Sequence, residues 1–336
     1  MVQLRALFIG AVVASAACGG SEEGPTAPLD YNDPATCNPL GTVNCLMPWP
    51  SAVYLEEDGS TATGVRVAVP QGAMPTNIDQ IVVDPTPLNR YDGFGPTGVI
   101  IAGFETGASD SNLPGPENID ASLAPDSPIV VLDMATGERI PFFAETDSTT
   151  DEPSEKSLLI RPMVRMPAGA RIAVGIRNSV KAYDGSDLAR PAGFQALIDD
   201  KSYSHPLFSK IEGRYPEIFD ALEGAGVPRD ELVLAWDFVV ASDDFLTRDL
   251  LTMRDASLPA IGEAGANLSY QLEEGSTRPD YVSNIYVGTH TAPNFLTNGE
   301  ADKSRLIRDD DGLPVLSGDY EANFAAIIPN CMAEAE

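Results

Sequence analysis

The segment IVVLDMATGERIPFF, residues 129–143, decides the fold class of this chain. It holds two apolar runs, residues 129–132 and 140–143, on either side of a connection that ends at Gly137. Two short runs of β-branched and aromatic residues around a turn with glycine are typical of a β-hairpin. We therefore expect two neighbouring antiparallel strands here.

Similar short runs recur along the first half of the chain, separated by turn residues. They cover residues 64–69, 98–104, 139–145, 157–161 and 170–177. Many short strands at this spacing are typical of a β-sandwich. The sequence therefore predicts an immunoglobulin-like β-sandwich domain over residues 37–185.

The pattern changes after residue 185. Apolar positions recur at helical spacing, and Ser242 can cap a helix that begins at Asp243 and runs towards Met253. Helical spacing appears in residues 192–199 and 217–223, and strand patterns appear in residues 232–241, 283–291 and 322–328. We expect a mixed helix and strand region over residues 186–336. The predicted fold class is mainly β with a helical insertion (α+β): an immunoglobulin-like sandwich followed by a helical layer and further strands.

The first residues predict export. Arg5 supplies a positive charge and residues 7–14 form an apolar stretch, which together are typical of a signal peptide over residues 1–17. Residues 15–18, SAAC, resemble the lipobox of bacterial lipoproteins, in which the cysteine receives the lipid. We expect lipidation of Cys18, a linker over residues 18–36, and a lipid-anchored place in the bacterial cell envelope, at the outer membrane or cell surface. The alternative is an ordinary signal peptide that is cut near Ala17.

The charge of the chain limits its partners. The formal net charge is -29, from 50 acidic and 21 basic residues. Binding of nucleic acid depends on basic side chains that release counterions from phosphates, so nucleic acid is not an expected partner.

The chain has four cysteines. With Cys18 lipidated, Cys37 and Cys45 are predicted to form a disulfide in an oxidising compartment, and Cys331 is left over. Two cysteines without a nearby histidine do not predict a zinc site.

Motifs that carry chemistry are incomplete. Residues 93–98 fit the G-x-G-x-x-G string, but the string contains a proline and precedes a strand, so it predicts a turn. Residues 309–312, DDDG, lack the spacing of a calcium loop and predict a solvated turn. The two histidines, His205 and His290, lie outside any catalytic motif, and no G-x-S-x-G string is present. We predict no catalytic residue, no metal ligand and no cofactor.

Several strings along the chain resemble one known family. They are CLMPWPS at residues 45–51, NRYDGF at 89–94, DSPIVVLD at 126–133, LIRP at 159–162 and LAWDF at 234–238. Together they resemble the N-terminal β-rich region of bacterial virulence-factor lipases, which precedes an α/β-hydrolase domain. The resemblance covers about residues 37–329. It implies that the hydrolase domain, with its catalytic residues, is absent here.

These observations predict a non-catalytic, lipid-anchored accessory or binding module. The expected partners are a membrane, reached through the N-terminal lipid, and a hydrolase domain or another envelope protein. One alternative is a lipase- or esterase-related protein whose activity needs a hydrolase domain supplied elsewhere. A second alternative is a structural envelope lipoprotein without a ligand.

Overall fold

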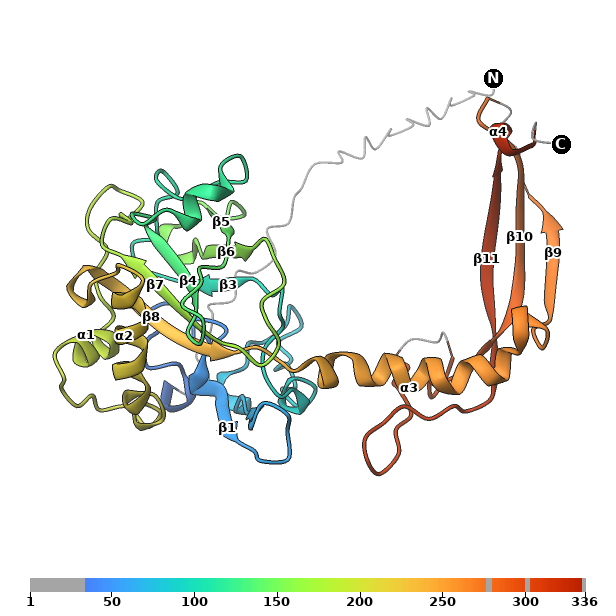
Figure 1. Ribbon diagram of the computed structural model, residues 1–336, viewed down its shortest axis with the longest axis horizontal. Coiled ribbons are helices and arrows are strands. Elements are labelled where there is room, and N and C mark those ends of the chain that lie inside the picture. Colours follow the sequence, from blue (N-terminus) through green and yellow to red (C-terminus); the bar gives the residue numbers. More distant parts are fainter. Residues whose placement is uncertain (1–33, 276–279, 300–302, 334–336) are drawn as a thin grey trace, which may run out of the picture. The chain divides into compact units, whose positions relative to one another are not determined.

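The computed structural model describes residues 34–275, 280–299 and 303–333. Its strands are β1 (Leu55–Glu57), β2 (Val65–Val67), β3 (Ile100–Ala102), β4 (Ile129–Asp133), β5 (Phe142–Thr146), β6 (Leu158–Pro162), β7 (Arg171–Arg177), β8 (Leu232–Val239), β9 (Tyr270–Glu274), β10 (Val282–Pro293) and β11 (Asp319–Pro329). Its α-helices are α1 (Ala192–Ile198), α2 (Tyr215–Gly224), α3 (Asp243–Ile261) and α4 (Asn330–Ala333). Short 3₁₀ turns connect many of these elements (Figure 1).

The described residues form antiparallel sheets and few helices, which confirms the α+β class. The strand orders are β1-β2, β3-β6-β5, β4-β7-β8 and β11-β10-β9. The immunoglobulin-like arrangement of the sandwich is not confirmed. In the third sheet β7 pairs with β8, so hydrogen bonds join strands on both sides of residue 185.

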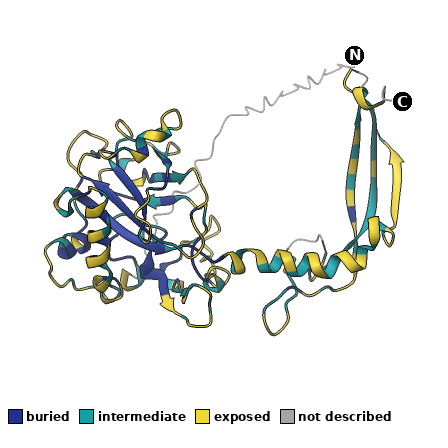
Figure 2. Ribbon diagram, in the orientation of Figure 1, coloured by how far each residue is buried: buried dark blue, intermediate teal, exposed yellow. Residues whose placement is uncertain are grey.

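The sheet β4-β7-β8 is buried on both faces. All five residues of β4 are buried, as are nearly all residues of β7 and β8, and helices α1 and α2 pack against this sheet (Figures 1 and 2). Gly175 of β7 allows the close approach of α2, because a Cβ at this position would lie 3.1 Å from a methyl carbon of Leu222. Continuous apolar runs suit strands that are covered on both sides.

The hairpin predicted for residues 129–143 forms only at its turn. Gly137 has φ +72°, and Ile140 N donates to Val131 O at 2.8 Å. Beyond this turn the two strands separate, because β4 pairs with β7 whereas β5 pairs with β6. The prediction of two neighbouring strands is therefore wrong, and the local signal identified the turn but not the partners.

The predicted start of the long helix is confirmed. The Oγ of Ser242 accepts a hydrogen bond from Phe245 N at 3.0 Å, and Asp243 and Asp244 lie in the first turn, near the positive end of the helix dipole. The helix continues past Met253 and ends at Ile261. It is followed by Gly262 at φ +77°.

The hydrophobic core is built from residues that precede α3. Its cluster of buried side chains runs from Leu40 to Val240, and among the described residues after Ala241 only Phe295 and Ala322 are buried hydrophobics. Within the described residues, no helix has the length and apolar character to cross a bilayer.

Cys37 and Cys45 form a disulfide, the pairing that their spacing predicts. The loop between them is tied to the core, since the hydroxyl of Tyr54 donates to Cys45 O at 2.9 Å and Asn38 N donates to the same oxygen at 2.7 Å. Cys331 is free and exposed.

Removal of this disulfide should destabilise the chain. The double variant Cys37→Ser, Cys45→Ser is expected to lose about 2.5 kcal/mol of unfolding free energy, because the bond limits the entropy of the unfolded loop. Urea denaturation at equilibrium measures the change. Cys331→Ser is the control and should leave the midpoint unchanged. Equal midpoints for the double variant and the wild type would contradict the expectation.

Candidate functional site

The two histidines do not form a catalytic group with other described residues. His205 is half-buried, and its Nε2 lies 3.1 Å from Pro34 O. The ring of His290 in β10 packs edge-to-face on Phe324, with 5.8 Å between ring centroids. Among the described residues no group of three histidine, cysteine or acidic side chains is placed to hold a metal ion.

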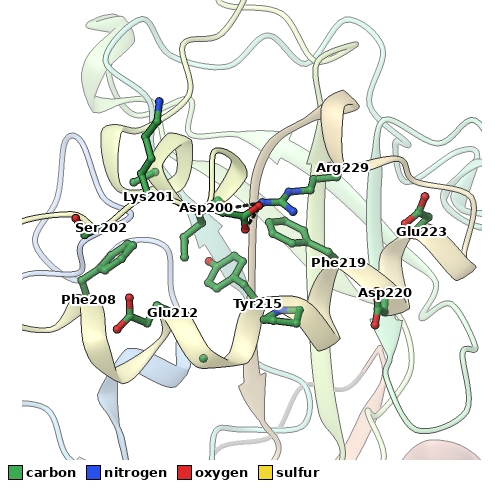
Figure 3. Close-up of a pocket in the computed structure, with 14 residues that line it drawn as sticks. Asp200, Lys201, Ser202, Phe208, Glu212, Tyr215, Phe219, Asp220, Glu223 and Arg229 are labelled. Carbon is green, nitrogen blue, oxygen red and sulfur yellow. Dashed lines mark hydrogen bonds and ion pairs between the residues drawn. The ribbon is translucent and has the colours of Figure 1, made fainter.

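One cavity, which we call the helix pocket, measures about 620 Å³ and lies beside α1 and α2 (Figure 3). Phe208, Tyr215 and Phe219 line it. The hydroxyl of Tyr215 donates to Ala235 O at 2.6 Å, and burial raises the pKa of this phenol well above its usual value. Tyr215 is therefore a structural group in this pocket.

The cations of the helix pocket already have partners. The guanidinium of Arg229 lies over the ring of Phe219, 4.4 Å from its centroid, and donates to Asp200 at 2.9 Å (Figure 3). The ammonium of Lys201 pairs with Asp199 at 3.0 Å. Three further lining residues are acidic: Glu212, Asp220 and Glu223. This charge balance is unfavourable for an anionic ligand.

A second cavity, which we call the arginine pocket, contains cations whose donors are not all used. It measures about 340 Å³ and is lined mainly by polar atoms. Its charged lining includes Arg66 of β2, Arg90 of the 3₁₀ turn η4 (Leu88–Arg90), and Arg248 of α3. Only 21 of the 336 residues are basic, and three of them line this cavity together with four aspartates, Asp92, Asp244, Asp310 and Asp311.

The start of α3 holds Arg248 beside this cavity. Asp92 accepts hydrogen bonds from the backbone N of Ser242 at 3.0 Å and from its hydroxyl at 2.5 Å. The ring of Phe245 packs on the ring of Tyr91, with centroids 4.8 Å apart. The guanidinium of Arg248 lies over the same Phe245 ring, 4.9 Å from its centroid.

The arginines differ in how far their hydrogen-bond donors are used. Arg66 pairs with Asp58 at 2.6 Å and donates to Arg90 O at 3.1 Å. The half-buried guanidinium of Arg90 makes no hydrogen bond or ion pair with a described residue. The Nε of Arg248 is buried and also lacks a partner among the described residues. Unused guanidinium donors are suited to bind an anion.

A fourth arginine, Arg308, lies next to this group. It pairs with Asp249 of α3 at 2.6 Å and donates to Gly312 O at 2.7 Å. The hydrogen bond from Arg308 lowers the pKa of Asp249, and the charges of Arg308, Arg90 and Arg248 lower it further, although burial opposes them. Arg308 is therefore ion-paired with Asp249, and the charges of Arg90 and Arg248 act on the same carboxylate.

The arginines also repel one another. Burial lowers the pKa of Arg90, and the neighbouring charges of Arg308 and Arg248 lower it further, whereas Asp249 opposes this change. Like charges at short range favour the binding of a counterion.

The turn at residues 309–312 forms as predicted and also lines the arginine pocket. Asp309 closes the turn, since Gly312 N donates to its carbonyl at 3.0 Å. Asp310 and Asp311 line the pocket, together with Asp244 of α3. Residues 93–98 are likewise a turn region before β3, as predicted.

No pattern in the sequence indicates the arginine pocket. Arg66, Arg90, Arg248 and Arg308 are far apart along the chain, and no motif surrounds any of them. The scarcity of basic residues was the one available signal, because the few that a strongly acidic chain retains are candidates for specific roles.

Comparison with known proteins gives a distant similarity to enzymes. The matched proteins include the phosphoglucosamine mutases of Streptococcus pneumoniae serotype 19F (strain G54), of strain Hungary19A-6 and of strain CGSP14. Each is 28% identical over an alignment of 155 residues, and the alignment covers 42% of this chain and 34% of the relative. The chain therefore spans about a third of the length of the curated relatives it matches. No family model matches the chain, and no solved structure matches it.

These comparisons correct two expectations. The resemblance to virulence-factor lipases is wrong, because the proteins matched are phosphoglucosamine mutases and not lipases. The prediction of a non-catalytic lipid-anchored module is also wrong, because the similarity is to an enzyme. The same finding also leaves the alternative, a lipase-related protein, without support. Cys18, the signal peptide and most of the linker lie outside the described residues.

Proposed function

We propose that this chain binds a phosphorylated amino sugar in the arginine pocket. The observation that carries the proposal is that Arg90 and Arg248, which both line this pocket, have guanidinium donors without a partner among the described residues. The lining combines arginines with aspartates, which suits a ligand that carries both an anionic and a cationic group.

The phosphate group would be bound by the unused guanidinium donors. Arg90 offers its whole guanidinium, and Arg248 adds a buried Nε without a partner among the described residues. Guanidinium groups bind phosphate oxygens through short charge-assisted hydrogen bonds. Such bonds contribute about 1.5 to 3 kcal/mol each.

The amino group would be bound by the acidic side of the same pocket. Asp244, Asp310 and Asp311 line it and can accept hydrogen bonds from an ammonium group. The cavity of about 340 Å³ lies at the lower end of the size range of small-molecule sites. A compact ligand with one anionic and one cationic group matches this lining better than a simple anion.

The similarity to known proteins supports the same class of ligand. The name of the matched relatives states that they act on phosphoglucosamine, a phosphorylated amino sugar. Because the chain spans about a third of those relatives, we propose the binding of this ligand class and no step of the mutase reaction.

Calorimetric titration with glucosamine 6-phosphate tests the proposal. We expect saturable binding by the wild-type chain, and a loss of affinity of about tenfold to a hundredfold for Arg90→Ala, which removes charge-assisted hydrogen bonds. Arg161→Ala is the matched control, because Arg161 pairs with Glu145 on the surface and lines neither pocket. Glucosamine without phosphate should bind more weakly.

Two outcomes would contradict the proposal. One is the absence of binding at millimolar ligand. The other is an equal loss of affinity in Arg90→Ala and Arg161→Ala, which would indicate a nonspecific effect of charge.

We also propose that the chain works outside the cytoplasm, in the cell envelope. The disulfide between Cys37 and Cys45 supports this location, since disulfides persist in oxidising compartments. The finer fold prediction, an immunoglobulin-like sandwich over residues 37–185, stays a prediction, which an experimental structure would test.

A further inference from the structure

The sheet β11-β10-β9 has two edges that differ in length and charge. In this sheet β10 lies between its neighbours, so β9 and β11 are the outer strands (Figure 1). The edge strand β9 has five residues, all exposed, and two of them are Glu273 and Glu274 (Figure 2). Short and charged edge strands resist pairing with other chains.

The edge strand β11 lacks this protection. It has 11 residues, and residues 322–328, ANFAAII, carry no charge and no proline. Ile327 is 58% exposed. A long, neutral and apolar edge strand is a ready partner for another strand.

Hydrogen bonds near the two ends of β11 show which of its backbone groups point towards β10. Gly318 O accepts from Asn294 N at 2.8 Å, Ile328 O accepts from the hydroxyl of Ser283 at 3.2 Å, and Asn330 N donates to Tyr281 O at 3.1 Å. These contacts show that the even-numbered residues of this strand direct their backbone N–H and C=O groups towards β10.

The odd-numbered residues therefore direct their N–H and C=O groups away from β10, since successive residues of a strand alternate. These residues are Glu321, Asn323, Ala325 and Ile327. Their outward groups have no hydrogen-bond partner among the described residues.

We propose that β11 pairs antiparallel with β11 of a second copy of this chain, about a two-fold axis at Ala325. Ala325 would then lie opposite Ala325 of the partner, and Asn323 opposite Ile327 of the partner. The two-fold axis repeats the pair of Asn323 and Ile327, so there are three residue pairs, and they would exchange about six hydrogen bonds. Two sheets of three strands would become one continuous sheet of six strands.

The side chains in this register are self-complementary. Phe324 lies opposite Ala326 of the partner, so a large residue meets a small one. Glu321 lies opposite Pro329 of the partner, and no two carboxylates face each other. A shift of the axis to Asn323 would place Ala325 opposite Glu321 of the partner, which is less favourable. A two-fold axis requires such a self-complementary surface.

The charge of the chain restricts where two copies can meet. Two copies that each carry -29 repel each other over most of their surfaces, and the run 322–328 is a neutral stretch at which they can meet. Because added salt screens this repulsion, the dimer should become more stable as the ionic strength rises. An oppositely charged partner would show the reverse dependence.

Sedimentation equilibrium of the full chain tests the proposal at protein concentrations up to on the order of 100 μM. We expect a species of twice the 35.6 kDa mass of one chain, and tighter association at ~0.5 M than at ~0.05 M salt. Ala325→Pro removes an outward N–H without touching the ladder to β10, and should weaken the dimer about tenfold or more. Ala325→Thr keeps this N–H and is the matched control.

Disulfide cross-linking tests the register without depending on the folding of a proline variant. In a Cys18→Ser, Cys331→Ser background, Ala325→Cys should form a covalent dimer on mild oxidation, whereas Glu273→Cys on the exposed strand β9 should not. A monomer at every concentration and salt, or equal cross-linking of the two cysteine variants, would overturn the proposal.

Discussion

Replacement of Asp237 by asparagine is expected to lower the free energy of unfolding by about 3 to 5 kcal/mol. Asp237 lies in β8, and only 3% of its surface is exposed. Its carboxylate pairs with Arg171 at 2.5 Å and with Arg214 at 2.5 Å. Removal of its charge would leave two partly buried guanidinium groups without their shared anion.

The effect of Asp237 on Arg171 is consistent with this expectation. Burial lowers the pKa of Arg171, but the charge and hydrogen bond of Asp237, followed by those of Glu217, outweigh this effect and raise the pKa of the guanidinium overall. Asp237 therefore supports a cation at a site where burial alone would disfavour it.

Glu217→Gln is the matched control for Asp237→Asn. Glu217 also pairs with Arg171, but its side chain is 70% exposed, so its loss should cost at most about 1 kcal/mol. Urea denaturation at equilibrium measures both variants. Equal changes in the two variants would contradict the assignment of Asp237 as the central group.

Replacement of Trp236 by alanine should cost about 3 to 5 kcal/mol, because it empties a large space in the core. Trp236 is 1% exposed, and its indole N–H donates to Pro50 O at 2.7 Å. This hydrogen bond joins two segments that are 186 residues apart in the sequence.

Trp236→Phe separates packing from hydrogen bonding. It keeps much of the ring but leaves Pro50 O without its donor, so we expect a smaller loss of about 1 to 3 kcal/mol. Thermal and urea unfolding measure both variants. If Trp236→Ala cost less than Trp236→Phe, or if both costs were negligible, the packing role of this residue would be disproved.

These two neighbouring residues point to opposite faces of β8, as successive strand residues do. Asp237 contacts Arg214, which directly precedes α2, whereas Trp236 reaches Pro50. The sheet β4-β7-β8 is thus held from both sides, by an ion-pair group on one face and by aromatic packing on the other.

The sequence by itself determined where many elements lie. Apolar runs located β7, β8, β10 and β11 to within a few residues, because β-branched and aromatic residues favour strands locally. Helical spacing located α1 and α2, and Ser242 marked the first residue before α3, because its side chain bonds to a backbone N–H only three residues away. The spacing of Cys37 and Cys45 likewise predicted their pairing, since a short loop holds the two thiols near each other.

Only the tertiary structure decided which elements meet. The segment 129–143 contains the turn at Gly137, but the partners of its strands, β7 and β6, are supplied by residues further along the chain. The arginine pocket likewise joins Arg66, Arg90 and Arg248 from distant segments. Local propensity acts over a few residues, whereas strand pairing and charge clusters depend on contacts between distant parts of the chain, and no local pattern encodes these contacts.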